Sequence, residues 1–382
     1  MTRFLLVGFA LSALFACGGP DWSSDTVEPP DQLGAFAVGH STFTAVDDRR
    51  AGRSLLVDIW YPVDADDALG AEPRQYTLSG LLGPVSEVAL ADPPVSSRRG
   101  QSLLIFTHGY GGINTSAVGL MEALASHGFI VAAPEHTGNA QQSPDDSFDQ
   151  AAENRVPDVS FLIDEMIRRN QDPVSAFHQR IDEARVGVLG HSFGGMTSIG
   201  MAAGWAGAAA DPRVVAILPM SAVIDKELQS DTRTSPNAGF TQEQLETISV
   251  PVMLMGGSAD VDVFLENNEL AFAQITNAPR VYKVEIVGAT HTHFANVCWI
   301  GDYLISIDFT EDKWPALGAG DLIEPYEATC GPDAFPIEQA NRLMNLYTVA
   351  FFKRHVLDQS GYDVYLTTDS AASEPAIRFS RK

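Results

Sequence analysis

The chain has 382 residues, of which 45% are hydrophobic and 19% are charged, as is typical of a folded protein with one large core. Its 49 acidic and 24 basic residues give a formal net charge of −25. This charge argues against a nucleic-acid partner, because phosphate groups would be repelled over most of the surface. We therefore expect a neutral small-molecule partner.

The first residues have the pattern of an export signal. Arg3 supplies a positive charge, residues 4–15 form an apolar run too short to span a membrane, and Cys17 follows a small residue. The end of this run resembles the lipobox of bacterial lipoproteins, which implies a lipid on Cys17 as the first mature residue. Phe15 departs from the usual lipobox, so plain secretion is the alternative. The expected divisions are a signal peptide over 1–16, a flexible tether over 17–34 and a folded domain over 35–382.

Apolar segments at regular intervals predict a domain of alternating strands and helices. Extended segments are expected over residues 35–46 and 53–61, followed by the strand–helix–strand unit 102–107, 116–127 and 129–133. Further strands are expected over 214–218, 251–255 and 281–287, with helices over 158–169 and 337–357. Residues 62–100, 138–157 and 221–249 are predicted insertions. The second of these is either a rim over the site or a solvated loop, the third has room for a cap helix, and the tail from Asp358 is expected to be peripheral.

A glycine-flanked serine follows the apolar residues 186–189. Residues 190–194 read Gly-His-Ser-Phe-Gly and precede a run of small and apolar residues. The pattern predicts a strand, a sharp turn at Ser192 and a helix, with glycines removing side chains that would clash with the strained turn. We expect Ser192 to be a nucleophile; the alternative is a glycine-rich surface loop.

An acid and a base follow later predicted strands. Asp260 comes after strand 251–255 and His291 after strand 281–287, so both should reach the edge of the sheet where parallel strands end. We expect His291 to act as general base for Ser192, and Asp260 to orient the imidazole. The competing candidates are His293 for the base and Asp262 for the acid.

Two backbone amides are candidates for an oxyanion hole. One belongs to Phe193, directly after the nucleophile, and the other to Tyr110, in the glycine-rich loop after strand 102–107. His108, in the same loop, is expected to be structural. A metal site at Asp260, Asp262 and Glu266 is disfavoured because the spacing lacks the glycine and the terminal glutamate of a calcium loop. We therefore expect no metal and no cofactor.

Several motifs resemble the platelet-activating-factor acetylhydrolases and the bacterial proteins called predicted dienelactone hydrolases. They are residues 190–195, His108-Gly109, residues 125–133 with 135–136, and residues 288–291 with 294–295, and the resemblance covers roughly residues 35–357. It implies the α/β-hydrolase fold, with a mostly parallel central sheet and helices on both faces.

Two departures qualify this resemblance. The animal acetylhydrolases carry their acid directly after the strand that follows the nucleophile helix, but residues 217–222 hold no carboxylate. An acid at Asp260 instead resembles the arrangement of cutinases and bacterial polyester hydrolases, as do Tyr110 and residues 190–195. True dienelactone hydrolases use a cysteine where this chain has Ser192.

The resemblance implies a serine esterase acting on short- to medium-chain carboxylic esters or acetylated lipids, and the N-terminal pattern adds the expectation that this enzyme is exported, lipid-anchored and monomeric. Alternatives are a polyester, cutin-type or lipid hydrolase, an amidase or acyltransferase with the same residues, and a lipoprotein that uses the fold only for binding. If Cys17 carries a lipid, an exported chain would pair its other cysteines, Cys298 and Cys330, just after His291. Two buried free thiols are the alternative.

Overall fold

A single mixed sheet forms the centre of the molecule. The computed structural model describes residues 27–78, 81–231 and 234–382. In these ranges the strands lie in the order β11-β10-β9-β8-β7-β5-β6-β2-β1-β4-β3. The run from β6 to β10 is parallel, and antiparallel pairs flank it. The strands are β1 (Ala37–Asp47), β2 (Arg53–Val63), β3 (Pro73–Leu78), β4 (Leu81–Ala91), β5 (Gln101–Thr107), β6 (Ile130–Glu135), β7 (Ile181–His191), β8 (Val214–Met220), β9 (Val252–Gly257), β10 (Val281–Ile286) and β11 (Ile377–Arg381).

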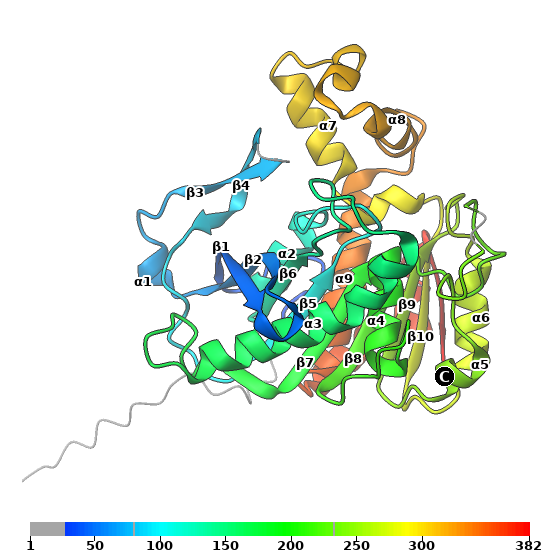
Figure 1. Cartoon of the computed structure of the whole chain (residues 1–382), viewed down its shortest axis with the longest axis horizontal. Helices are drawn as coiled ribbons and strands as arrows, with labels where there is room; N and C mark the ends of the chain where they lie inside the picture. The colour runs from blue at the N-terminus through cyan, green and yellow to red at the C-terminus, as the bar shows by residue number, and fades with distance from the viewer. Residues whose placement is uncertain (1–26, 79–80, 232–233) are drawn as a thin grey trace, which may run out of the picture.

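Helices cover both faces of the sheet (Figure 1). Apolar side chains of α2 (Val118–Ser126) and α9 (Ile337–His355) pack on one face, and those of α3 (Phe148–Gln171), α4 (Phe193–Ala203) and α6 (Glu266–Gln274) pack on the other. The shorter helices are α1 (Ala65–Ala68), α5 (Gln242–Glu246), α7 (Val297–Ser306), α8 (Ile323–Cys330) and α10 (Thr368–Ala371), with 3-10 turns at Asp48–Arg50, His291–Phe294, Glu311–Leu317, Gly320–Leu322 and Ser360–Tyr365. This architecture confirms the predicted α/β fold class. Within the described ranges, no helix combines the length and the apolar character needed to cross a membrane.

The central strands are buried on both faces, as their apolar runs predicted. In β5, Leu103 and Ile105 join the apolar cluster under α3 and α4, whereas Leu104 and Phe106 join the cluster under α2 and α9. Because side chains alternate along a strand, a strand covered on both sides has no polar face. Because the strands from β6 to β10 are parallel, they all end at the same edge of the sheet, and the residues that follow them lie there.

The predicted insertion at 62–100 extends the sheet instead of forming an irregular loop. It contains α1 and the paired strands β3 and β4. The indole N–H of Trp60 donates a hydrogen bond to the hydroxyl of Tyr76 (2.7 Å), which donates to the buried carboxyl of Glu122 on α2 (3.0 Å). These buried bonds fasten the insertion to the body of the domain.

Much of the predicted rim or loop at 138–157 is helical. The helix α3 begins at Phe148 and runs through Pro157, whereas the sequence predicted a helix only from residue 158. Its start has a capping box, in which the Ser147 side chain accepts from the Gln150 amide and the Gln150 side chain accepts from the Ser147 amide. Tertiary packing of α3 on the sheet overrides the local penalty of an internal proline.

The third predicted insertion, residues 221–249, has two parts. Val223, Gln229 and Ala238 line a cavity beside Ser192, whereas α5 packs beside α4 and α6 with Leu245 fully buried. The helix in this insertion is therefore a core element at the far end of α4, and it is not a cap over Ser192 (Figure 1).

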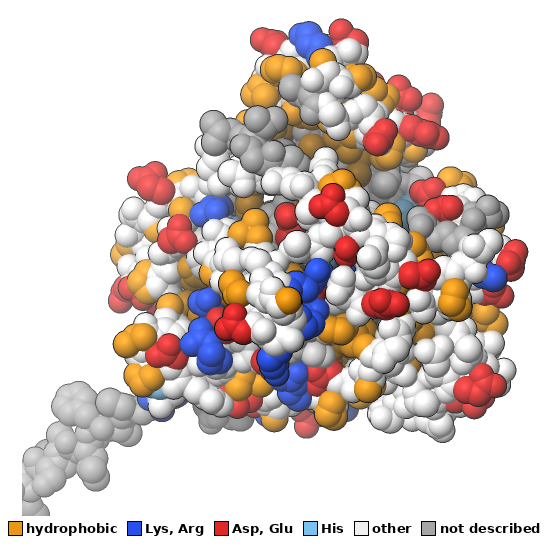
Figure 2. Space-filling view, viewed as in Figure 1, with side chains coloured by type: hydrophobic (Ala, Val, Ile, Leu, Met, Phe, Trp, Pro, Cys, Tyr) orange, Lys and Arg blue, Asp and Glu red, His pale blue; other side chains and the backbone are white. Residues whose placement is uncertain are grey.

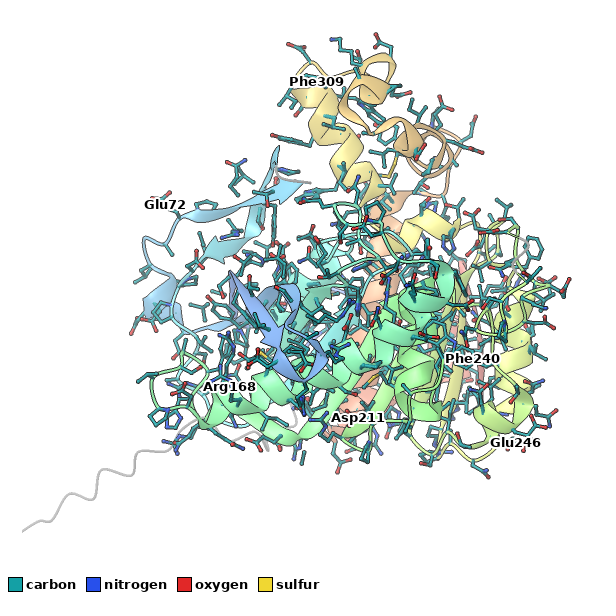
Figure 3. All side chains as sticks on the ribbon, in the orientation of Figure 1. Glu72, Arg168, Asp211, Phe240, Glu246 and Phe309 are labelled. Atoms are coloured by element: carbon teal, nitrogen blue, oxygen red, sulfur yellow. A yellow bond between two sulfur atoms is a disulfide. The ribbon has the colours of Figure 1, made fainter. Side chains whose placement is uncertain are left out.

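A helical arm, defined here as residues 297–330, projects from the body directly after His291 (Figure 1). It contains α7 and α8, which the sequence did not predict. Cys298 and Cys330 form a disulfide at its base, with their Cα atoms 5.5 Å apart. Figure 2 shows apolar and acidic side chains on its surface, and Figure 3 places Phe309 near its tip.

Both ends of the described chain pack on the domain. At the C-terminus, β11 pairs antiparallel with β10, so this part of the predicted peripheral tail belongs to the sheet. At the N-terminus, residues 27–34 contact the body although they were predicted to be part of a flexible tether: His127 contacts Glu28 (3.3 Å) and the carbonyl of Gln32 (2.9 Å), and Gly34 donates to Ser126 Oγ (2.8 Å). The predicted signal peptide and Cys17 lie outside the described residues.

Candidate active site

Ser192 occupies the turn between β7 and α4, where the sequence placed it. Its φ of 58° and ψ of −118° put it in a strained conformation, and its N–H donates to the carbonyl of Met220 (2.8 Å). A Cβ at Gly190 would lie 2.4 Å from the Gly194 carbonyl oxygen, and one at Gly194 would lie 1.9 Å from that of Thr107. The turn therefore requires both glycines.

Asp260 and His291 meet at the same edge of the sheet. Nδ1 of His291 lies 2.8 Å from Oδ2 of Asp260, while Oδ1 of Asp260 accepts from the amides of Asp262 (3.0 Å) and Val263 (2.8 Å). Burial alone would raise the pKa of Asp260, but the hydrogen bonds from His291 and the Val263 amide outweigh it and hold this pKa below its ordinary value. The carboxylate is therefore ionised and can fix the imidazole so that Nε2 is left for the reaction.

The imidazole of His191 packs against that of His291, with ring centroids 4.5 Å apart. Burial, together with the neighbouring His291, lowers the pKa of His191 to about 3. At neutral pH this ring is therefore uncharged, and it supports His291 by packing.

His293 and Asp262, the competing candidates, have other roles in the structure. His293 accepts from the Thr290 amide at Nδ1 (2.9 Å), and its Nε2 lies 2.9 Å from the carbonyl oxygen of Phe335. Both nitrogens of His293 are thus used in contacts with the backbone. Asp262 is exposed and contributes its amide to Asp260.

One group of three potential metal-binding side chains occurs in the described residues, namely Asp260, Asp262 and His291. Glu266, the third member of the site weighed from the sequence, does not belong to it. Since Asp260 and His291 already bind each other, their facing atoms are used without an ion.

Tyr110 and Phe193, the candidates for the oxyanion hole, line a common cavity with Ser192. Their rings are in edge contact, with centroids 5.3 Å apart, and Tyr110 also stacks on Phe148 with centroids 5.9 Å apart. The cavity has a volume of about 60 Å³, and its other walls come from Met196, Val223, Gln229, Ala238 and Val263. A cavity of this small size beside a serine suits a short acyl group.

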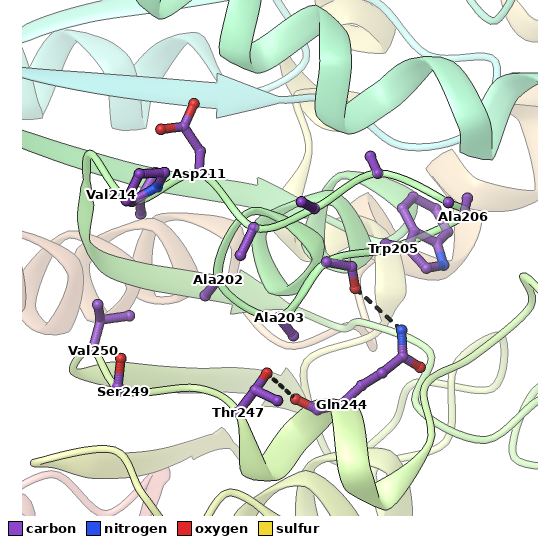
Figure 4. Close-up of a pocket in the computed structure, with 16 residues that line it drawn as sticks. Ala202, Ala203, Trp205, Ala206, Asp211, Val214, Gln244, Thr247, Ser249 and Val250 are labelled. Atoms are coloured by element: carbon purple, nitrogen blue, oxygen red, sulfur yellow. Dashed lines mark hydrogen bonds between the residues drawn. The ribbon is translucent and has the colours of Figure 1, made fainter.

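A larger hollow of about 800 Å³ lies at the other end of α4 (Figure 4). Its walls include Ala202, Trp205 and Gln244, and the Gln244 side chain donates to the carbonyl of Gly204 (3.2 Å). This hollow lies near the start of β8, whereas reacting groups gather where the parallel strands end. We assign it no role in the chemistry.

The sequence did not predict the role of a fully buried arginine on α3. Arg155 donates to the carbonyl oxygens of His108 (2.6 Å) and Gly109 (2.9 Å), in the loop that carries Tyr110. His108 is structural, as expected: its Nδ1 lies 2.7 Å from the Gly109 oxygen. A charged residue within a predicted loop gave no local signal of these long-range contacts.

The sheet, the strained turn and the order Ser192, Asp260, His291 along the chain are those of the α/β-hydrolase fold. The profile of the Chlorophyllase family matches residues 90–267, a range that ends before His291. Among solved structures, a ferulic acid esterase from Streptomyces cinnamoneus superposes with a TM-score of 0.61 at 23% identity, over 90% of this chain and 96% of that chain. At this identity the likeness establishes the fold.

Curated relatives are cutinases of Thermobifida. Cutinase est2 of Thermobifida alba is 25% identical over 238 residues, or 58% of this chain and 67% of that protein. Cutinase 2 of Thermobifida cellulosilytica is 26% identical over 185 residues, or 48% of this chain and 57% of that protein. The chain thus spans about half to two thirds of the length of these relatives.

Proposed function

We propose that the chain is a carboxylic-ester hydrolase that works through an acyl-enzyme on Ser192. The observation that carries this proposal is the 2.8 Å bond between Asp260 and His291, formed at the sheet edge where Ser192 occupies its strained turn. The similarity to cutinases supports the same class of reaction.

The reaction begins when His291 Nε2 takes the hydroxyl proton of Ser192 and the oxygen attacks the ester carbonyl. Asp260 stabilises the resulting imidazolium, and the amides of Tyr110 and Phe193 stabilise the oxyanion of the tetrahedral intermediate. The imidazolium then gives its proton to the leaving alcohol. Water, deprotonated by the same histidine, attacks the acyl-enzyme and releases the acid and Ser192.

The small cavity favours short acyl groups, from acetyl upwards to medium chains. The platelet-activating-factor acetylhydrolase-like activity suggested by the sequence motifs belongs to this range. A polyester or cutin-type substrate is the second candidate, because relatives are cutinases and because Tyr110 is 41% exposed and stacks on Phe148 beside Ser192. Such a surface could hold part of a large ester outside the acyl cavity.

The proposed function includes export of the protein from the cytoplasm. The pattern over residues 1–17 favours a lipoprotein signal with lipidation at Cys17, and the disulfide between Cys298 and Cys330 suits an oxidising compartment. The enzyme would then act as a monomer held near a membrane surface by its lipid.

Hydrolysis of p-nitrophenyl esters from acetate to decanoate tests the function. Turnover should be highest for short acyl chains and should vanish in Ser192→Ala. The matched control is Ser198→Ala on the same helix, whose hydroxyl donates only to the Gly194 carbonyl (3.0 Å). A folded wild-type protein that neither hydrolyses any ester nor reacts with a fluorophosphonate probe would contradict the proposal and favour a binding lipoprotein.

A further inference from the structure

The arginine side chain of Arg155, on α3, is fully buried, which is unusual for a charged residue. In the described structure its guanidinium donates to four uncharged oxygens, those of the His108 and Gly109 carbonyls, Oδ1 of Asn139 (2.6 Å) and the hydroxyl of Thr107 (3.5 Å). Taking a guanidinium out of water is costly unless its hydrogen bonds are replaced. Two of these four acceptors, the His108 and Gly109 carbonyls, lie in the loop that carries Tyr110.

The bond to Gly109 fixes the peptide plane that contains the Tyr110 amide. The Gly109 carbonyl oxygen accepts from Arg155 Nη2 (2.9 Å) and the Gly112 amide (3.3 Å), and it contacts His108 Nδ1 (2.7 Å). This peptide is trans, since the described chain has no cis bond. The N–H of Tyr110 therefore points away from Arg155.

The loop that contains this peptide lies close to the nucleophile. A Cβ built on Gly109 would lie 3.5 Å from the Cβ of Ser192, so the loop passes directly beside the serine. Holding the Gly109 carbonyl on Arg155 thereby directs the Tyr110 N–H towards the space in which an oxyanion on the substrate would form.

Arg155 also contacts the residue that carries the second amide. Its guanidinium carbon lies 4.8 Å from the centroid of the Phe193 ring, and the Phe193 amide directly follows Ser192. One buried side chain thus contacts Phe193 and the Gly109 carbonyl, which belongs to the same peptide unit as the Tyr110 amide.

A buried chain of polar groups holds His108 in one tautomer. The amide of His136 donates to Nε2 of His108 (3.2 Å), so the proton of the neutral ring is on Nδ1, where it is donated to the Gly109 carbonyl. His136 Nδ1 in turn contacts the buried carboxylate of Asp158 (2.9 Å). Burial lowers the pKa of His136 to about 4 and that of His108 well below its ordinary value, so both rings are neutral at neutral pH.

We propose that Arg155 is a positioning residue for the oxyanion hole, acting through the Gly109 carbonyl and the Phe193 ring on the amides of Tyr110 and Phe193. The inference rests on the proposed esterase function. It predicts that loss of the guanidinium weakens transition-state stabilisation more than it weakens substrate binding.

Paired ester and thionoester substrates test this role. Sulfur is a weaker hydrogen-bond acceptor than oxygen, so the thionoester gains less from well-placed amides. In Arg155→Met, kcat for the ester should fall about 10- to 100-fold with KM little changed, and the ratio of ester to thionoester kcat/KM should fall as well. Arg155→Lys, which keeps the charge and part of the hydrogen bonding, should recover part of both.

The matched control is Arg169→Met on the same helix, where the guanidinium pairs with Glu165 (2.8 Å) and covers Phe43. Its ester to thionoester ratio should equal that of the wild type. If Arg155→Met does not fold, Asn139→Ala removes one anchor of the guanidinium and should lower the ratio in the same direction.

Equal losses on both substrates in the folded variants would overturn the inference and leave Arg155 with a purely structural role. That result is distinct from failure of the proposed function. In the latter case the wild-type protein would hydrolyse no ester and Ser192 would not react with a fluorophosphonate.

Discussion

Oδ2 of Asp260 and Nδ1 of His291 lie 2.8 Å apart, although 31 residues separate them in the chain. Parallel strands β9 and β10 bring them together, because each residue follows the end of its strand. The other oxygen of the carboxylate is held by two backbone amides, so its orientation does not depend on His291 alone.

Asp260→Asn should therefore lower kcat for esters about 10³- to 10⁴-fold. The neutral amide can no longer stabilise the imidazolium and can present its NH₂ group to Nδ1, which favours the wrong tautomer. Steady-state kinetics on p-nitrophenyl acetate measure the effect. Asp262→Asn, which keeps the amide that binds Asp260, is the control, and a comparable loss in that variant would contradict the assignment of the acid.

Substitutions of His291 and His293 should have different effects on ester turnover and on stability. His291→Gln should abolish ester turnover, since the general base is lost. His293→Gln should mainly lower the thermal unfolding midpoint, because it disturbs the hydrogen bonds to Thr290 and Phe335. Activity that depends on His293 and tolerates His291→Gln would reverse the two assignments.

Buried histidines should make the fold sensitive to acid. The pKa is lowered by burial to about 4 in His136 and to about 3 in His191, and falls well below its ordinary value in His108, whereas each titrates near 6.5 when unfolded. As the pH falls, these histidines therefore become protonated in the unfolded chain at a higher pH than in the folded protein. The stability due to these neutral rings is present above about pH 6.5 and is lost as the pH falls, by about 1.4 kcal/mol per histidine and pH unit.

Urea unfolding between about pH 7.5 and pH 5 measures this dependence. The free energy of unfolding should fall towards acid, with a slope that is shallower by about one proton in His191→Phe. A free energy that is flat over this range would show that these rings are not buried and neutral.

Loss of the disulfide should reduce the stability of the helical arm more than it reduces the rate of ester hydrolysis. Cys298 and Cys330 are 32 residues apart, and a bridge over such a loop contributes about 3–4 kcal/mol by restricting the unfolded chain. The double variant Cys298→Ser/Cys330→Ser should become sensitive to protease within residues 297–330 and keep most of its turnover of soluble esters. Digestion followed by mass spectrometry checks the first point. If the double variant lost all turnover while its arm stayed resistant to protease, the disulfide would instead be needed for catalysis.

The size of the acyl cavity should set the preference for chain length. Val223 lines the cavity and is almost fully buried, so Val223→Ala should raise the ratio of octanoate to acetate kcat/KM, by about tenfold for each methylene newly accommodated. Val174→Ala, at a position 91% exposed, is the control. An unchanged ratio in Val223→Ala would show that acyl chains bind elsewhere.

Much of the fold was predictable, because strands buried on both faces leave long apolar runs and the turn at Ser192 needs glycines at fixed positions. The positions of Asp260 and His291 after such strands indicated their meeting place. The start of α3 was partly predictable: Ser147 and Gln150 form a capping-box pattern, but Pro157 pointed to a later start. Local propensity argued against a helix that tertiary packing stabilises.

The remaining features depend on contacts between distant residues. Arg155 binds the His108 carbonyl across 47 positions, and no local pattern marks a buried arginine within a polar stretch. The arm was missed: α7 and α8 pack mainly on each other and are joined at their base by the disulfide, outside the alternation of strands and helices that the sequence indicated.

The most direct test of Ser192 as the nucleophile is to locate the acyl group on the enzyme. Wild-type protein mixed with p-nitrophenyl acetate should be quenched with acid within the first turnovers and examined by peptide mass spectrometry. We expect an acetyl group on the peptide that contains Ser192, and none in Ser192→Ala. An acetyl group on another residue that disappears as product forms, or sustained turnover by Ser192→Ala, would contradict the claim that Ser192 is the nucleophile.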